Sequence, residues 1–335
     1  MKAKLAGVVP DFELKVKAES AAEINRLKVE KNAVILGHNY MEPALFNSVP
    51  DFVGDSLELA RRAARTDKDI IVFCGVRFMA ETAKILNPTK TVLLPSEKAG
   101  CSLAASITGA DVRELKKRFP GVPVVTYVNT YADVKAESDI CCTSGNARAI
   151  VESLNTDTVI FLPDEYLAKN VAKETGKHII FPTQDPRKKF EDDLNYQMIG
   201  WLGRCEVHEK FTVEDIVNVR KQFPDVTILA HPECSPEVVA ASDFSGSTSA
   251  MIKHVENTSA GHYLLLTECS MGDNVAAANP DKEMLRLCSV RCPHMNQITL
   301  EETLESLKKN QYVIEIPEEV LKRAARSVER MIAIG

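Results

Sequence analysis

Three cysteines could share one metal site. The chain has nine cysteines among 335 residues, and thiolates select zinc, cuprous copper or iron–sulfur clusters. Structural zinc sites usually contain a CxxC pair; the sequence has none, and its nearest approach is Cys288 with Cys292. We expect Cys101, Cys205 and Cys292 to hold one [4Fe–4S] cluster, which leaves one iron open to substrate.

An internal repeat favours these three cysteines over the others. Segments that begin at His38, Tyr127 and Ala230 align on three aspartates, each followed five residues later by serine or threonine. One cysteine then follows each aspartate: Cys101 lies 50 residues after Asp51, Cys205 lies 66 after Asp139, and Cys292 lies 49 after Asp243. Repeated units fold alike, so three distant thiols can converge. The alternative is that they are buried core cysteines, which are common.

Hydroxyl side chains stand where a helix is expected to begin in each repeat. They are Ser56, Ser144, Ser247 and Thr248. The simple interpretation is helix capping. A hydroxyl together with free backbone N–H groups at the positive end of a helix can also bind an anion. Three such positions, each facing the carboxyl end of a strand, predict a shared pocket for a polyanionic substrate.

Polar side chains follow the first expected strand of each repeat. They are His38 and Tyr40, Tyr127 and Asn129, and His231 and Glu233. Histidine can move protons near neutral pH, so His231 and Glu233 are candidates for proton transfer. His38 and Tyr40 are candidates for orienting a substrate, and His208 follows Cys205 closely enough to lie near a cluster. A single strand-end histidine is more often structural; two at equivalent positions favour function.

These side chains require an α/β fold to position them. Short apolar runs predict strands buried on both faces, as in parallel sheets, at 33–36, 70–74, 91–94, 122–128, 158–162, 178–181, 226–230 and 263–267. Amphipathic stretches predict helices at 56–65, 112–119, 147–154, 213–222 and 300–309. Alternation of the two indicates α/β architecture.

The repeat predicts three similar α/β/α sandwich domains in a pseudo-threefold triangle around a central cluster. Approximate boundaries are 1–100 with about 293–335, then 101–204, then 205–292. We expect the last segment, 300–335, to fold back on the first domain.

Composition narrows the function further. The net charge of −6 argues against a nucleic-acid surface driven by bulk positive charge. The sequence contains no run of 18 apolar residues, so it predicts no membrane-spanning helix. The amino terminus lacks a secretory apolar core, so we expect a reducing cytoplasm, where cysteine clusters are more often metal or catalytic sites than disulfides.

Long motifs in almost the whole chain, from about Ala33 to the last helix, resemble the quinolinate synthase family. They are GHNYMEP, DFVGDSLELA, GVRFMAETAKIL, CSLAASI, YVNTYADVKAESDICCTS, GWLGRCEVHEKF, AHPECSPEV, SGSTSAM, TECSMGDN and CPHMN. The resemblance implies a trilobed fold around a [4Fe–4S] cluster. It also implies condensation of iminoaspartate with dihydroxyacetone phosphate to quinolinate, an early step of NAD biosynthesis.

The resemblance also implies roles for residues of this chain. It places the cluster ligands at Cys101, Cys205 and Cys292. It places the substrate pocket at His38, Tyr40, Ser56, Tyr127, Asn129, Ser144, His208, His231, Glu233, Ser247 and Thr248. Catalytic roles fall on Tyr40, Tyr127, His231 and Glu233. Cys288 is close to Cys292, and in some family members such a pair forms a redox-sensitive disulfide.

Other functions remain open from the sequence alone. One is a different iron–sulfur dehydratase that acts on a hydroxy acid and needs no triose phosphate site. Another is a sensor that binds zinc or an iron–sulfur cluster and has no pocket with three anion sites. The resemblance to the family also implies one protein partner besides the two substrates. We expect a transient contact with L-aspartate oxidase, which would supply iminoaspartate.

Overall fold

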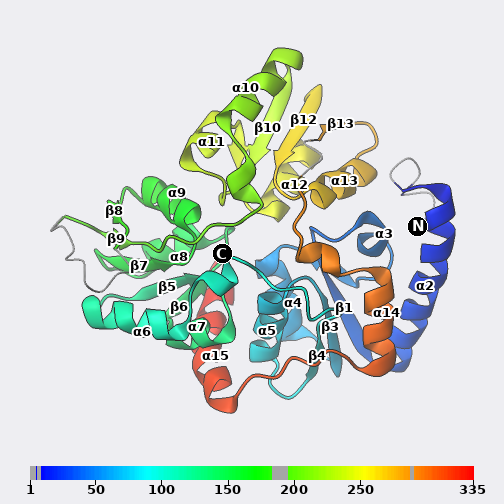
Figure 1. The fold of residues 1–335 in the computed structure, drawn as a ribbon, viewed down its shortest axis with the longest axis horizontal. Coiled ribbons are helices and arrows are strands. Elements are labelled where there is room, and N and C mark those ends of the chain that lie inside the picture. The colour runs from blue at the N-terminus through cyan, green and yellow to red at the C-terminus, as the bar shows by residue number, and fades with distance from the viewer. Residues whose placement is uncertain (1–4, 6–8, 183–194, 287–289) are drawn as a thin grey trace.

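Three parallel β-sheets with alternating helices form the protein. The computed structural model describes all residues except 1–4, 6–8, 183–194 and 287–289. Figure 1 shows the sheets in three lobes, with the carboxyl terminus between the first and second lobes. The predicted α/β class is confirmed, whereas the pseudo-threefold axis stays a prediction. Within the described residues, no helix is both long enough and apolar enough to cross a membrane.

The first sheet has the strand order β2-β1-β3-β4, and all its neighbours are parallel. All six residues of its inner strand β1 are buried, as the apolar run predicts. The elements of this unit are α2 (Asp11–Glu30), β1 (Ala33–His38), α3 (Pro43–Phe46), β2 (Phe52–Gly54), α4 (Ser56–Arg65), β3 (Ile70–Cys74), α5 (Arg77–Leu86) and β4 (Thr91–Leu93).

The second sheet has five parallel strands in the order β6-β5-β7-β9-β8. Its elements are η1 (Ala104–Ser106), α6 (Gly109–Arg118), β5 (Val124–Tyr127), α7 (Ala132–Glu137), β6 (Ile140–Cys142), α8 (Ala147–Ser153), β7 (Val159–Leu162), α9 (Glu165–Thr175), β8 (Ile179–Ile180) and β9 (Met198–Ile199).

The third sheet has the order β11-β10-β12-β13 and is again parallel. Its elements are η2 (His208–Lys210), α10 (Val213–Gln222), β10 (Val226–Ala230), α11 (Pro236–Ala241), β11 (Phe244–Ser245), α12 (Thr248–Asn257), β12 (His262–Leu266), α13 (Cys269–Ala278) and β13 (Glu283–Leu285). The chain ends with η3 (Met295–Gln297), α14 (Leu300–Lys309) and α15 (Glu318–Ile332).

The aspartates that align the sequence repeat have the same structural role in all three units. Each precedes the short edge strand β2, β6 or β11, and its carboxylate accepts a hydrogen bond from a backbone N–H at the neighbouring inner strand. The bonds join Asp51 to Ile35, Asp139 to Val124 and Asp243 to Ile228, each at 2.8 Å. The predicted repeat is therefore confirmed at these positions.

The three cysteines also occupy equivalent turns. In each turn the cysteine carbonyl accepts a hydrogen bond from the N–H four residues later, donated by Ala105, Glu209 and Asn296. A threonine seven residues after each cysteine then caps the next helix through its hydroxyl: Thr108 for α6, Thr212 for α10 and Thr299 for α14. The equivalence identifies Cys292 as the third member of the set; Cys288 lies outside the described residues.

The carboxyl-terminal segment, which we expected to fold back on the first domain, contacts both the first and the second unit. Helix α14 does pack against α2, but α15 packs mainly against α7 and β6 of the second unit. The Ser327 hydroxyl of α15 donates to the Lys135 carbonyl of α7 at 2.8 Å. Arg61 of α4 also donates to the Ile332 carbonyl. The final helix thus joins the first two units, and the predicted domain boundaries stay predictions.

We predict that Asp139→Ala destabilises the fold by about 1–3 kcal/mol, because it leaves the buried N–H of Val124 without its side-chain acceptor. The thermal unfolding midpoint, followed by circular dichroism, measures the loss. Asp157→Ala, at an exposed loop position, is the matched control and should unfold like the wild type. Equal midpoints for the two variants would show that the repeated aspartate contributes nothing to stability.

Candidate active site

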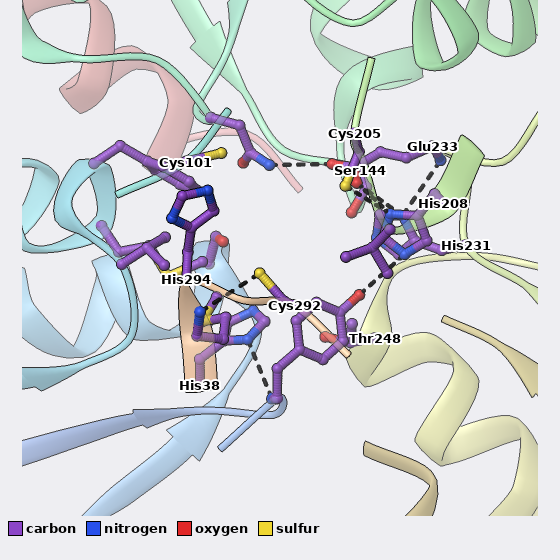
Figure 2. Close-up of a pocket in the computed structure, with 18 of the residues that line it drawn as sticks. His38, Cys101, Ser144, Cys205, His208, His231, Glu233, Thr248, Cys292 and His294 are labelled. Atoms are coloured by element: carbon purple, nitrogen blue, oxygen red, sulfur yellow. Dashed lines mark hydrogen bonds and ion pairs between the residues drawn. The ribbon is translucent and has the colours of Figure 1, made fainter. Parts of the chain in front are cut away.

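A cavity lies where the three units meet. Figure 2 shows side chains from all three units around it. Its lining residues include His38, Tyr40, Asp55, Ser56, Gly100, Cys101, Ser102, Tyr127, Asn129, Thr143, Ser144, Cys205, Glu206, His208, His231, Glu233, Thr248, Cys292 and His294.

The cavity collects every site residue predicted from the sequence except Ser247. Ser247 lies beside it, where its hydroxyl donates to Asp55 Oδ2 at 2.9 Å and caps α12 by accepting the Ala250 N–H. The bonded pair joins the start of α4 in the first unit to the start of α12 in the third. Ser247 therefore contributes to the junction between two units.

The expectation that each hydroxyl caps a helix is correct only for Ser247. Asp55 caps α4, so Ser56 is the first helical residue, and Asn146 precedes α8. Asp55 accepts the backbone N–H of Glu58, whereas the Asn146 side chain makes no capping bond. The hydroxyls of Ser56 and Ser144 make no capping bond and both line the cavity.

The three predicted ligand cysteines line the cavity and are half-buried. Burial raises the pKa of Cys101 to about 12 and that of Cys292 to about 11, and it raises the pKa of Cys205 well above its usual value. Among the described cysteines none forms a disulfide. Three soft donors, one from each unit, fit a cationic iron–sulfur cluster, because bound metal favours the thiolate form.

Cys205, His208 and Glu233 lie close enough together to suggest a site for a single ion. Hydrogen bonding already explains this closeness. His208 Nδ1 lies 2.6 Å from Glu233 Oε2 and 3.3 Å from Cys205 Sγ, so one ring N–H can serve both acceptors. The closeness of the three residues therefore does not require an ion between them.

His38 and His231 have the same arrangement in the first and third units. The Nδ1 atom of His38 accepts the backbone N–H of Tyr40 at 3.2 Å, and that of His231 accepts the N–H of Glu233 at 3.3 Å. Burial lowers the pKa of His38 to about 4 and that of His231 to about 3. Both rings are thus neutral near pH 7, with Nε2–H left as a donor.

A buried chain of hydrogen bonds starts at Tyr40, which lines the cavity. Tyr40 Oη lies 2.5 Å from Thr267 Oγ1, and Thr267 Oγ1 lies 2.9 Å from His208 Nε2. The other ring nitrogen of His208 meets Glu233. With the His208 proton on Nδ1, Tyr40 donates to Thr267, and Thr267 donates to His208. The chain can therefore carry a proton from Tyr40 towards Glu233.

Glu233 is held in its ionised form. Burial opposes ionisation, but contacts with His208, His231 and Tyr127 outweigh it and lower the pKa of Glu233. Asn129 Nδ2 also donates to Glu233 Oε1 at 3.1 Å. This bond orients the amide of Asn129, whose Oδ1 is buried and has no partner among the described residues. Asn129 Oδ1 is therefore an acceptor available to a ligand.

Sequence reasoning missed Thr267, Asp55, Glu206 and His294. Thr267 is buried and does not line the cavity; it acts only through Tyr40 and His208. Its signal in the sequence is weak, since it is one threonine at the end of a predicted strand. The described lining also contains no lysine or arginine. An anionic ligand would therefore meet neutral donors, helix starts and whatever metal the thiols hold.

Comparisons with known proteins agree over nearly the whole chain. A family model described as Quinolinate synthetase A protein matches residues 22–333. Quinolinate synthase 2 of Mesorhizobium japonicum is 53% identical over 327 residues, which cover 98% of this chain and 95% of the relative. The Quinolinate synthase of Agrobacterium fabrum is 52% identical over 331 residues, covering 99% of this chain and 90% of the relative. This chain belongs to the quinolinate synthetase A family.

Proposed function

We propose that the protein is a quinolinate synthase that condenses iminoaspartate with dihydroxyacetone phosphate to form quinolinate, phosphate and two waters in NAD biosynthesis. Atoms and electrons balance in this reaction, so it needs no external oxidant. The observation that carries the proposal is the meeting of three half-buried thiols with a pocket of neutral donors and a chain of hydrogen bonds. The names of the relatives agree with it.

Cys101, Cys205 and Cys292 would hold the [4Fe–4S] cluster. When bound, such a cluster has one iron without a protein ligand, which can act as a Lewis acid towards an oxygen of the substrate. Each unit contributes one thiol to the cavity. The described lining of the cavity contains no lysine or arginine. The proposal therefore requires first that all three cysteines bind the iron of one cluster.

The anionic groups of the substrates fit the helix starts that face the cavity. Ser56 and Thr248 are the first residues of α4 and α12, where backbone N–H groups are free. The Nε2–H donors of His38 and His231 add neutral hydrogen bonds. We assign phosphate and carboxylate binding to these groups together with Ser144. Neutral donors hold an anion without the ion pair that would oppose phosphate release.

Proton movement is assigned to Tyr40. Burial raises its pKa well above the usual value, so its phenol is protonated in the resting enzyme. Thr267 and His208 can accept that proton in turn, and ionised Glu233 stabilises it on His208. Glu233 therefore acts through His208, whereas His231 serves as a donor. This revises the sequence-based assignment of His231 and Glu233 as a pair that transfers protons directly.

Two further assignments are parts of the proposal. The imine substrate is unstable in water, and an enzyme that oxidises aspartate must supply it, which favours a transient contact with L-aspartate oxidase. We also propose that the protein works in the cytoplasm, where its thiols stay reduced.

Iminoaspartate generated in the assay together with dihydroxyacetone phosphate tests the function. The anaerobically prepared wild type should form quinolinate, detected by chromatography and mass. Omission of either substrate should abolish the product. An iron–sulfur protein that ignores dihydroxyacetone phosphate but dehydrates a hydroxy acid would contradict the proposal in favour of another dehydratase.

We predict that Cys101→Ala, Cys205→Ala and Cys292→Ala each lose bound iron and quinolinate formation, because each removes one of three ligands. Iron and sulfide analysis with an activity assay measures the effect. Cys74→Ala is the matched control; Cys74 is fully buried in the core of the first unit and does not line the cavity. Full activity in a Cys292→Ala protein without iron would exclude the scheme.

We predict that Thr267→Val lowers kcat by about tenfold or more while KM and iron content change little. The reason is that Thr267 connects Tyr40 to His208 without touching the cavity. Thr267→Ser keeps the hydroxyl and should restore most of the rate. Steady-state kinetics of the two variants decides the point. Wild-type turnover in Thr267→Val would remove Thr267 from the mechanism and leave the direct contact of Tyr40 Oη with His208 Nε2, at 3.4 Å, as the only connection between them among the described residues.

A further inference from the structure

The solvent side of the cavity carries one polar residue from each cysteine turn. Ser102 follows Cys101 directly, Glu206 follows Cys205 directly, and His294 lies two residues after Cys292. All three line the cavity. The side chains of Glu206 and His294 are only partly exposed, at 35% and 29%. They therefore form a boundary with water on one side and the cavity on the other.

One carboxylate oxygen joins these three turns. Glu206 Oε1 accepts a hydrogen bond from the Ser102 hydroxyl at 2.7 Å. The same oxygen lies 3.1 Å from His294 Nε2. Glu206 of the second turn is thus the shared partner of the first and third turns. Loss of this one side chain would remove both connections at once.

The third turn also contacts the first directly. A methyl group at Gly100 would lie 3.7 Å from His294 Nδ1, so the ring packs beside the residue that precedes Cys101. Figure 2 shows the ring between Cys101 and Cys292. The ring, the carboxylate and the hydroxyl therefore extend across the cavity wall next to the cysteines.

We infer that Ser102, Glu206 and His294 form a latch that ties the three cysteine turns together and limits access of solvent molecules to the cluster. The inference rests on the proposed cluster. It concerns retention of the metal, not the reaction, because none of these residues belongs to the proton chain or to the anion-binding groups. Each turn carries one proposed ligand, so a tie between the turns would keep the three thiols together around the cluster.

Iron release to a ferrous-iron chelator under anaerobic conditions tests the latch. Glu206→Ala should release iron about tenfold faster than the wild type, since two bonds to a charged group are lost. Ser102→Ala should have a smaller effect of about threefold. The matched control is Glu209→Ala, which removes the same charge from an exposed position on the same turn and should release iron at the wild-type rate.

The combined variant gives the sharper result. The Ser102 hydroxyl donates to Glu206 Oε1, and Glu206→Ala already removes this bond. Ser102→Ala added to Glu206→Ala should therefore not accelerate iron release further. Independent, additive effects would contradict a shared latch. Equal iron-release rates in Glu206→Ala and Glu209→Ala would overturn the latch but not the proposed function. If Glu206→Ala does not fold, a wild-type rate in Ser102→Ala overturns it. A wild type without iron and sulfide would overturn both the latch and the proposed function.

Discussion

The structure depends on one constraint: three thiols that are far apart in the sequence must meet in one cavity. The chain meets it by building the same unit three times. In each unit an aspartate carboxylate fixes the edge strand to the inner strand. A turn with the same carbonyl bond and the same threonine cap presents the cysteine. Because the turns are alike, the thiols reach the cavity in equivalent ways.

The second feature of the site is the distribution of charged and neutral groups in the cavity wall. The described cavity wall has no lysine or arginine, and burial holds His38 and His231 neutral. Half-buried thiols with raised pKa values would stay protonated in this cavity unless a metal cation bound them. The proposed phosphate site would use N–H and O–H donors in the same cavity, beside the ionised Glu233. The proposed metal and anion binding would thus share one electrostatic environment.

The sequence predicts the inner strands well, because long apolar runs such as β1 are buried on both faces. It misses the edge strands β2, β6, β11 and β13 and also the inner strand β9, which have only two or three residues each. The repeat correctly groups the cysteines at one cavity, since equivalent positions fold alike. Thr267 could not be predicted, because its role depends on Tyr40 and His208 from distant segments. The position of α15 likewise depends on packing against α7, which periodicity does not specify.

The most direct test of the central claim is the Mössbauer spectrum of the wild type reconstituted with ⁵⁷Fe under anaerobic conditions. The account predicts about four iron and four sulfide ions per chain in one cubane. It also predicts that one iron in four changes its signal when substrate or product is added. A protein that binds a single zinc ion, or a cluster in which all four irons stay unchanged by ligand, would contradict it.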